Sequence, residues 1–171
     1  MDEPVRLVAY DPAWPAAFKA EASRLEELIG PWLTGGLHHV GSTAVPGMSA
    51  KPVVDILGGV ASLPESAPCI AVLQSADWWY APYLPDVMHW FCKPSPAHRT
   101  HHLHLVPTGS QRFVSELVFR DGLRSDAAVA ADYLRLKRRL AARFPDDREA
   151  YTAGKAGFIE ETVRAVLGVG G

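Results

Sequence analysis

The stretch "HHVGSTAVPGMSAKPVVDIL", residues 38–57, joins two apolar segments through a turn of small and hydroxyl-bearing residues. The flanking segments GLHHV (36–40) and PVVDILGGV (52–60) have the composition of β-strands. The second is an almost continuous apolar run, which is typical of a strand buried on both faces of a sheet, and Asp55 lies inside it. The stretch therefore predicts strand, turn and strand, and the turn either binds phosphate or simply connects two buried strands.

The turn has some features of an anion site. Gly41 and Gly47 allow tight backbone geometry, while Ser42 and Thr43 offer hydroxyl and backbone N–H groups that can surround an anion. The turn matches neither the GxxxxGK[ST] loop nor the GxGxxG fingerprint. Lys51 could bind phosphate as a point charge, although a lone lysine before a strand is more often solvated. Taken alone, the turn is a weak indication of phosphate binding.

Hydrophobic periodicity extends this reading to the whole chain. Strands are concentrated in the first two-thirds, with one or two helices between them, and only helical patterns follow Gly109. This order predicts an α/β or α+β fold, a sheet covered by helices, in one domain of residues 1–171. The predicted strands are 5–10, 36–40, 52–60, 87–93 and 101–107; the predicted helices run from 11–15 to Gly30, over 64–77, over 111–123, from a cap at Ser125 or Asp126 to Phe144, and over 147–167.

Composition excludes several classes of protein. With 171 residues, 48% of them hydrophobic, the chain can bury a core, and its net charge of −2 provides no global basic field for long nucleic acid. We find no membrane-length apolar run and no amino-terminal leader, and expect a cytoplasmic protein. Cys69 and Cys92 lie outside zinc or disulfide spacings, so we expect buried, reduced thiols. Nothing in the sequence indicates an oligomeric state.

Asp55 is the main candidate for chemistry, because an ionised carboxylate in a buried strand needs a cation to offset its desolvation. That partner is a neighbouring arginine or lysine, or a metal. His102 and His104 share one face of a strand. They could bind a metal with Asp55 as third ligand, contact phosphate, or serve a structural role. We expect His101 to point away, and His39, beside the glycine turn, is a candidate for the same site.

Basic side chains supply candidate anion ligands. Arg99, just before the histidine strand, could clamp an anion with its bidentate fork. Arg120 is a second candidate, and Tyr151 and Lys155 share a helix face at i and i+4. We expect most other basic residues of the helices to be solvated, with one or two reaching the pocket; these are Arg124, Lys137, Arg138 and Arg139.

Six segments give the chain a strong resemblance to the GrpB family over nearly its whole length. They are YDPAWP, HVGSTAVPG, KPVVDI, HHLHLV, FRDGLR and FPDDREAYTAGK. The resemblance implies a nucleotidyltransferase-like fold, a small mixed sheet flanked by helices, here with a helical C-terminal third. In that superfamily a Gly-Ser turn contacts nucleotide phosphates, and acidic residues on strands hold magnesium that activates the attacking oxygen.

The resemblance also assigns roles to residues. Gly41 and Ser42 match the phosphate-binding turn, and Asp55 matches the first metal-binding acid. Leu57 stands where the second acid is expected, and a histidine replaces the third if HHLHLV is the later strand. Magnesium prefers hard oxygen ligands, whereas one aspartate with histidines suits zinc, manganese, iron or nickel better. The implied cofactor is a divalent metal, Mg, Mn or Zn.

The expected function is therefore a nucleotidyltransferase-like protein that binds a nucleotide or phosphorylated small molecule, with metal-assisted transfer at the Asp/His site. Catalytic and metal-binding roles fall to Asp55, His102 and His104. Two alternatives remain open: a non-catalytic, chaperone-like accessory module with a degenerate site, and a metal-dependent hydrolase. Fusion of family members to dephospho-coenzyme A kinase favours a nucleotide or coenzyme setting.

Overall fold

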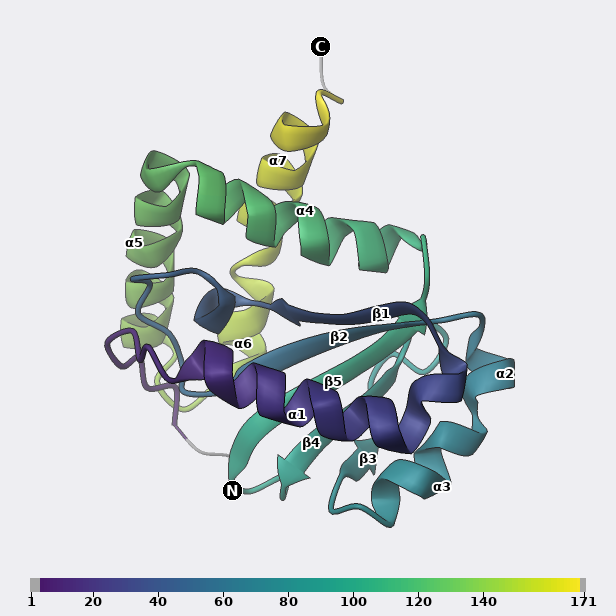
Figure 1. The fold of residues 1–171 in the computed structure, drawn as a ribbon. Coiled ribbons are helices and arrows are strands. Elements are labelled where there is room, and N and C mark those ends of the chain that lie inside the picture. Colours follow the sequence, from purple (N-terminus) through teal and green to yellow (C-terminus); the bar gives the residue numbers. More distant parts are fainter. Residues whose placement is uncertain (1–3, 170–171) are drawn as a thin grey trace.

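The structure, a computed structural model that describes residues 4–169, contains a five-stranded sheet with helices on both faces (Figure 1). The strands are β1 (Leu33–Val40), β2 (Val54–Val60), β3 (Trp79–Ala81), β4 (His89–Pro94) and β5 (Arg99–Pro107). The helices are α1 (Trp14–Ile29), α2 (Leu63–Ser66), α3 (Pro68–Gln74), α4 (Gln111–Ser125), α5 (Ala127–Arg143), α6 (Arg148–Ala153) and α7 (Ala156–Leu167), and 3-10 turns cover Gly30–Trp32 and Ser42–Ala44.

The sheet is mixed, with strand order β1-β2-β5-β4-β3. β2 and β5 run parallel at its centre, and the other neighbouring strands pair antiparallel. In this register Asp55 lies beside His102, and Leu57 lies beside His104. Val40, the last residue of β1, is the other neighbour of Asp55. Because paired residues point to the same face of a sheet, these side chains share one face.

The opposite face packs against α1 and α3. Pro15 lies in the first turn of α1, where a missing N–H costs nothing. One turn apart at its other end, Leu25 and Ile29 are fully buried, in one cluster with Ile56 of β2 and Leu103 of β5. This burial fixes α1 along the sheet, where Figure 1 shows it.

The face that carries Asp55 is covered in part by the helical third. Figure 1 shows α4 crossing beside β1, with α5 and α7 beyond it. Phe119 of α4, Tyr133 of α5 and Val163 of α7 form a buried cluster that also includes Val45 and Met48 from the segment after β1. The helical third therefore holds the glycine turn against the end of the sheet.

The strand predicted over 5–10 is wrong, since only Val8 pairs there, in an isolated bridge with Ala50. The backbone of this segment hydrogen-bonds to two different parts of the chain. The Val5 N–H donates to the Pro145 carbonyl, and Val8 and Ala50 each donate to the carbonyl of the other. No single neighbour runs alongside it for long enough to form a ladder.

Two of the predicted helices are each split. The helix predicted over 64–77 becomes α2 and α3, with Pro68 at the start of the second. The helix predicted over 147–167 becomes α6 and α7, separated by Gly154 and Lys155. A Cβ at Gly154 would lie 2.5 Å from Leu140 Cδ2, so close packing against α5 requires glycine at this break. The three-residue β3 was too short to predict.

Of the alternatives for the α5 cap, Asp126 is the N-cap, and its Oδ1 accepts hydrogen bonds from Ala128 and Val129. Within residues 4–169, none of the helices combines the length and apolar character needed to cross a membrane.

Candidate functional site

Asp55 and His102 are hydrogen-bonded across the parallel pair β2 and β5. Nδ1 of His102 lies 2.9 Å from Oδ1 of Asp55, and because an ionised carboxylate only accepts, the imidazole N–H donates. Nε2 of His102 is then left with a lone pair, and it is buried with no hydrogen-bond partner among the residues that the structure describes. The Asp55 side chain is 27% exposed, so it lies at the rim of the sheet and is less buried than its apolar neighbours in the sequence predict.

Their protonation states suit metal binding. Burial raises the pKa of Asp55, but the hydrogen bond from His102 and the charges of His102, His104 and Lys51 outweigh it and lower the pKa to about 2. Burial lowers the pKa of His102, and this effect exceeds the opposing effect of Asp55. At neutral pH the pair is an ionised carboxylate and a neutral imidazole that points its free nitrogen away from the carboxylate, the arrangement that supports a metal ligand.

His104 has a carboxylate partner of its own. Its Nδ1 lies 3.3 Å from Oε1 of Glu116 on α4, and Arg112, one helical turn earlier, donates to the same oxygen. Burial lowers the pKa of His104, but the charge and hydrogen bond of Glu116 raise the pKa by more than burial lowers it, so the net shift is upward. The His102 and His104 rings are nearly parallel, at 23°, with centroids 6.4 Å apart. One donor atom each from Asp55, His102 and His104 lies within 4.8 Å of the others.

This donor set fits some metals better than others. Leu57, at the position where the resemblance expects a second acid, is fully buried beside His104. One carboxylate and two imidazoles are a poor match for magnesium, which takes mainly oxygen ligands. They match zinc or manganese, which accept imidazole and carboxylate together.

The glycine turn lies directly against Asp55. Gly41 has φ of +73°, and a Cβ there would lie 2.6 Å from Oδ2 of Asp55, so both the conformation and the space require glycine. Ser42 Oγ accepts a hydrogen bond from Nζ of Lys137 at 2.9 Å, and the same ammonium donates to the Ser49 carbonyl at 2.6 Å. A lysine of α5 therefore fixes the turn that borders the Asp/His group.

Three lysines gather beside the turn; we call Lys51, Lys137 and Lys155 the lysine cluster. Nζ of Lys51 and of Lys155 lie 5.2 and 4.5 Å from the ring centre of Tyr151. Burial, followed by repulsion from Lys155 and Arg148, lowers the pKa of Lys51 to about 8. Burial and repulsion from the other two lysines lower the pKa of Lys137 to about 7.

Burial also lowers the pKa of Lys155, against the attraction of Asp55. Asp55 is the acidic group that opposes these shifts at both Lys51 and Lys155. One carboxylate does not balance three amines, so the cluster favours an added anion.

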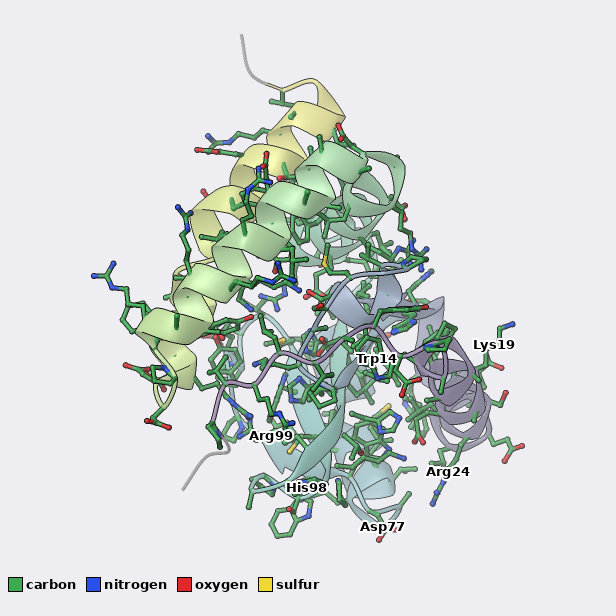
Figure 2. The ribbon with its side chains drawn as sticks, turned by 90° about the vertical axis from the view of Figure 1, so that its left-hand side faces the viewer. Trp14, Lys19, Arg24, Asp77, His98 and Arg99 are labelled. Carbon is green, nitrogen blue, oxygen red and sulfur yellow. The ribbon has the colours of Figure 1, made fainter. Side chains whose placement is uncertain are left out.

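Arg99 lies on the same side of the sheet. Its guanidinium carbon is 5.3 Å from the ring centre of Trp90, and its Nε donates to the Pro96 carbonyl at 2.9 Å. Figure 2 shows Arg99 toward the C-terminal helices, whereas Lys19 and Arg24 point outward from α1 on the other side of the sheet.

Arg120 and Thr43 form a separate group. Arg120 donates to the His39 carbonyl at 3.1 Å and to Asp121. Nε2 of His39 lies 3.0 Å from Oγ1 of Thr43, and the ring stacks on Phe18 with centroids 5.0 Å apart. Burial, with the charges of both Arg124 and Arg120, lowers the pKa of His39 to about 4 despite Asp55. These side chains support the turn from the α1 side and are not brought next to the two strand histidines.

Two residues of the site were not assigned to it from the sequence. Glu116 is one acid among many on the helices, and its only local signal is Arg112 four residues earlier. Lys137 was grouped with basic residues expected to be mostly solvated, but it reaches the turn, with 2% of its surface exposed. Arg124 of the same group also reaches the turn, since its Nε donates to the Ala44 carbonyl at 2.8 Å. Only packing distinguishes Lys137 from its neighbours Arg138 and Arg139.

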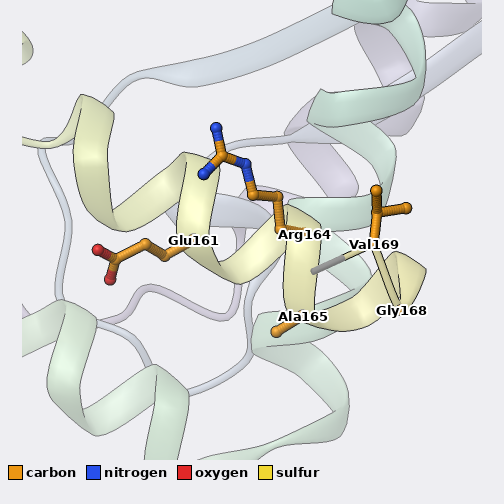
Figure 3. A pocket seen from close by; sticks show the side chains of 5 residues that line it. All are labelled: Glu161, Arg164, Ala165, Gly168 and Val169. Carbon is orange, nitrogen blue, oxygen red and sulfur yellow. The ribbon is translucent and has the colours of Figure 1, made fainter. Parts of the chain in front are cut away.

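Two surface hollows formed by described residues lie away from Asp55. One lies between α1 and α4 and includes Phe18, His39, Arg120 and Arg124. Figure 3 shows the other, at the C-terminal end of α7, lined by Glu161, Arg164, Ala165, Gly168 and Val169.

Known proteins resemble the chain in sequence and in fold. The sequence model described as GrpB protein matches residues 4–165. A UPF0157 protein of Pseudomonas aeruginosa is 38% identical over 98% of this chain and 68% of its own length. A protein named dephospho-CoA kinase from Mycolicibacterium paratuberculosis is 32% identical over 94% of this chain, which spans 46% of that protein.

Solved structures agree with the sequence comparison. The crystal structure of the conserved protein GrpB from Enterococcus faecalis, 29% identical, superposes with a TM-score of 0.85 over 95% of this chain and 98% of its own. Cid1, an RNA terminal uridylyl transferase, is 14% identical, with a TM-score of 0.51 over 76% of this chain and 39% of its own, and thus shares the fold only. The match to Cid1 shows a fold in common, and the sequence model together with the GrpB crystal structure shows that the chain belongs to the GrpB family.

Proposed function

We propose that this protein binds a nucleotide or another phosphorylated small molecule in the cytoplasm, together with a divalent metal that assists transfer at the Asp/His site. The observation that carries the proposal is the placement of the lysine cluster beside the Asp55, His102 and His104 group on one sheet face. Phosphate needs positive charge, and a metal needs lone pairs. This end of the sheet offers both. The likeness to dephospho-CoA kinase and the fold shared with Cid1 support a nucleotide setting.

Each part of the site has a separate task in this proposal. Lys51 and Lys155 bind phosphate oxygens, and the backbone of the Gly41 turn lines the same space. His102 and His104 hold the metal through ring nitrogens and Asp55 through a carboxylate oxygen, while Asp55 and Glu116 also orient the two rings. A bound divalent metal would neutralise phosphate charge and polarise a phosphorus–oxygen bond.

Calorimetry with tripolyphosphate and with ATP, each with Mn²⁺, tests the phosphate part. We expect Lys51→Gln and Lys155→Gln to weaken binding of both by ten-fold or more, because each removes a charge-assisted contact. Lys19→Gln, on the outer side of α1, is the matched control and should bind as the wild type does. No binding by the wild type, or equal binding by all variants, would contradict the proposal.

Metal titration tests the other part. His102→Ala and His104→Ala should lose Zn²⁺ or Mn²⁺ binding, whereas His98→Ala, an exposed histidine outside the group, should retain it. Glu116→Gln should weaken the metal ten- to hundred-fold without unfolding the protein, because it changes only the support of His104. Equal metal affinity in all four variants would contradict the metal-binding part of the proposal.

The second candidate is a binding module that does not transfer a nucleotidyl group, and Leu57 in place of a second acid favours it. Incubation with radiolabelled nucleoside triphosphates, Mn²⁺ and a mixed acceptor pool distinguishes the two. A labelled product that is absent with Asp55→Ala would show transfer. Retained nucleotide binding without product would favour the module.

A further inference from the structure

The sheet face that carries the Asp/His group continues beyond it onto β4 and β3. Trp90 of β4 pairs with His104, and Trp79 of β3 pairs with Cys92, which itself pairs with His102. All of these side chains therefore share the face of Asp55. The helical third lies over the other half of the sheet, where α4 packs on β1, β2 and β5.

Large apolar side chains are exposed at the β3 and β4 side of this sheet face. Trp79 is 54% exposed and Tyr83 is 53% exposed, and Leu84 and Val87 of the same short segment are exposed as well. Most tryptophan side chains are buried in a folded protein, so an exposed aromatic group next to a polar site suggests a ligand. We call Trp79, Tyr83 and Trp90 the aromatic surface.

Ring contacts connect the aromatic surface to the metal-ligand candidates. The centroids of Trp90 and His102 are 5.1 Å apart, and those of Trp90 and Tyr83 are 6.5 Å apart. The guanidinium of Arg99 lies over Trp90, and its charge is near enough to lower the pKa of Lys51. A continuous path therefore leads from the lysine cluster past Arg99 and His102 to exposed aromatic rings.

We propose that the aromatic surface binds the base of a nucleotide whose phosphates lie on the lysine cluster. This inference rests on the proposed function and narrows its substrate class, since a phosphorylated compound without a base would leave these rings exposed. Every nucleobase has a π-face, and stacking on an aromatic side chain contributes about 1–3 kcal/mol of binding free energy. Stacking is tolerant of base identity, so the surface selects nucleotides as a class.

The test compares ATP with tripolyphosphate, which carries the same phosphates and no base, at one ionic strength and with Mn²⁺. We expect the wild type to bind ATP about ten-fold more tightly or better, and to bind ATP, GTP, CTP and UTP within about ten-fold of one another. Tyr83→Ala should weaken ATP binding by about five-fold or more and leave tripolyphosphate binding unchanged. Tyr83→Phe keeps an aromatic ring and should restore the affinity for ATP.

Tyr83 is suited to the test because it is half exposed, so the variant should fold. Val166→Ala, which shortens another exposed apolar side chain on α7, is the control and should leave both affinities unchanged. Equal affinity of the wild type for ATP and tripolyphosphate would overturn the base site and leave the proposed function intact. Equal loss of both ligands in Tyr83→Ala would also overturn it, and failure of both to bind the wild type would overturn the proposed function itself.

Discussion

Burial of the Lys137 side chain lowers the stability of the fold, while its hydrogen bonds position the glycine turn of the site. Only 2% of its surface is exposed, and its ammonium group donates to Ser42 and to the Ser49 carbonyl, with no paired carboxylate among residues 4–169. Burying an unpaired charge costs free energy. The lysine responds by releasing its proton more easily, and its pKa falls to about 7.

Stability should therefore rise with pH. The unfolded chain holds the Lys137 proton up to its ordinary pKa near 10.5, whereas the folded protein releases it near 7. Since the unfolded state binds more protons in between, the free energy of unfolding should increase by about 2 kcal/mol from pH 7 to pH 9. Urea denaturation without ligand measures this. Lys137→Met should lose this part of the increase and keep the smaller part that the lowered pKa of Lys51 contributes, and an identical increase in both proteins would contradict the explanation.

The sequence predicted the strand side of the site well, because alternation along a strand is a strong constraint. His102 and His104 do share a face, and Asp55 does lie beside them, because one parallel register places all three together. Helical positions carry less information. The second half of α5 is rich in basic residues, and only the tertiary contacts with Ser42 and Ser49 distinguish Lys137 from the rest.

Among the elements, the turn between β1 and β2 positions the most chemistry. Gly41 and Gly47 both have positive φ, +73° and +79°, but only Gly41 lies against another group. Around Gly47 no atom lies within 4 Å of an added Cβ. Substitution of Gly47 therefore measures the free-energy cost of positive φ alone. Substitution of Gly41 adds the cost of displacing Asp55.

Gly41→Ala and Gly47→Ala should thus have different effects. Gly47→Ala should destabilise the protein by about 1 kcal/mol, the cost of a left-handed conformation for a residue with a Cβ, and leave metal binding intact. Gly41→Ala adds a contact of 2.6 Å with Oδ2 of Asp55 and should also weaken Mn²⁺ binding at least ten-fold. Urea denaturation measures the loss of stability, and metal titration measures the loss of affinity. Equal Mn²⁺ affinities of the two variants would show that displacement of Asp55 does not affect metal binding.

Element boundaries depended on contacts that the sequence does not display. The apolar alternation of residues 5–10 predicts a strand, but Val8 finds a partner only in Ala50. The break between α6 and α7 was missed because Gly154 is required by Leu140, a residue of another helix. Fold class, in contrast, follows from the order of strands and helices, which a few such errors do not change.

At the scale of the whole molecule, the site joins two parts of the chain. Lys51 and the glycine turn belong to the sheet, whereas Lys137 and Lys155 belong to the helical third. Within the described residues, this third also packs on the turn through the cluster of Phe119, Tyr133 and Val163. A phosphate ligand held by all three lysines would therefore link the two parts and stabilise them together.

Hydrogen exchange should detect this link. Saturating tripolyphosphate with Mn²⁺ should slow amide exchange in α5 and α7 as well as in residues 41–55, because opening either part would release the ligand. Exchange in α2 and α3, on the opposite face, should change little and serves as the control. Protection confined to residues 41–55 would show that the helical third takes no part in binding.

The lowered pKa values of the lysine cluster have a further consequence for calorimetry. At pH 8, Lys137 is largely deprotonated and Lys51 is about half deprotonated, since their pKa values are about 7 and about 8. An arriving polyanion restores the charged forms, so complex formation takes up protons from the buffer. The measured enthalpy then varies with the ionisation enthalpy of that buffer, and its slope counts the protons that the amines acquire.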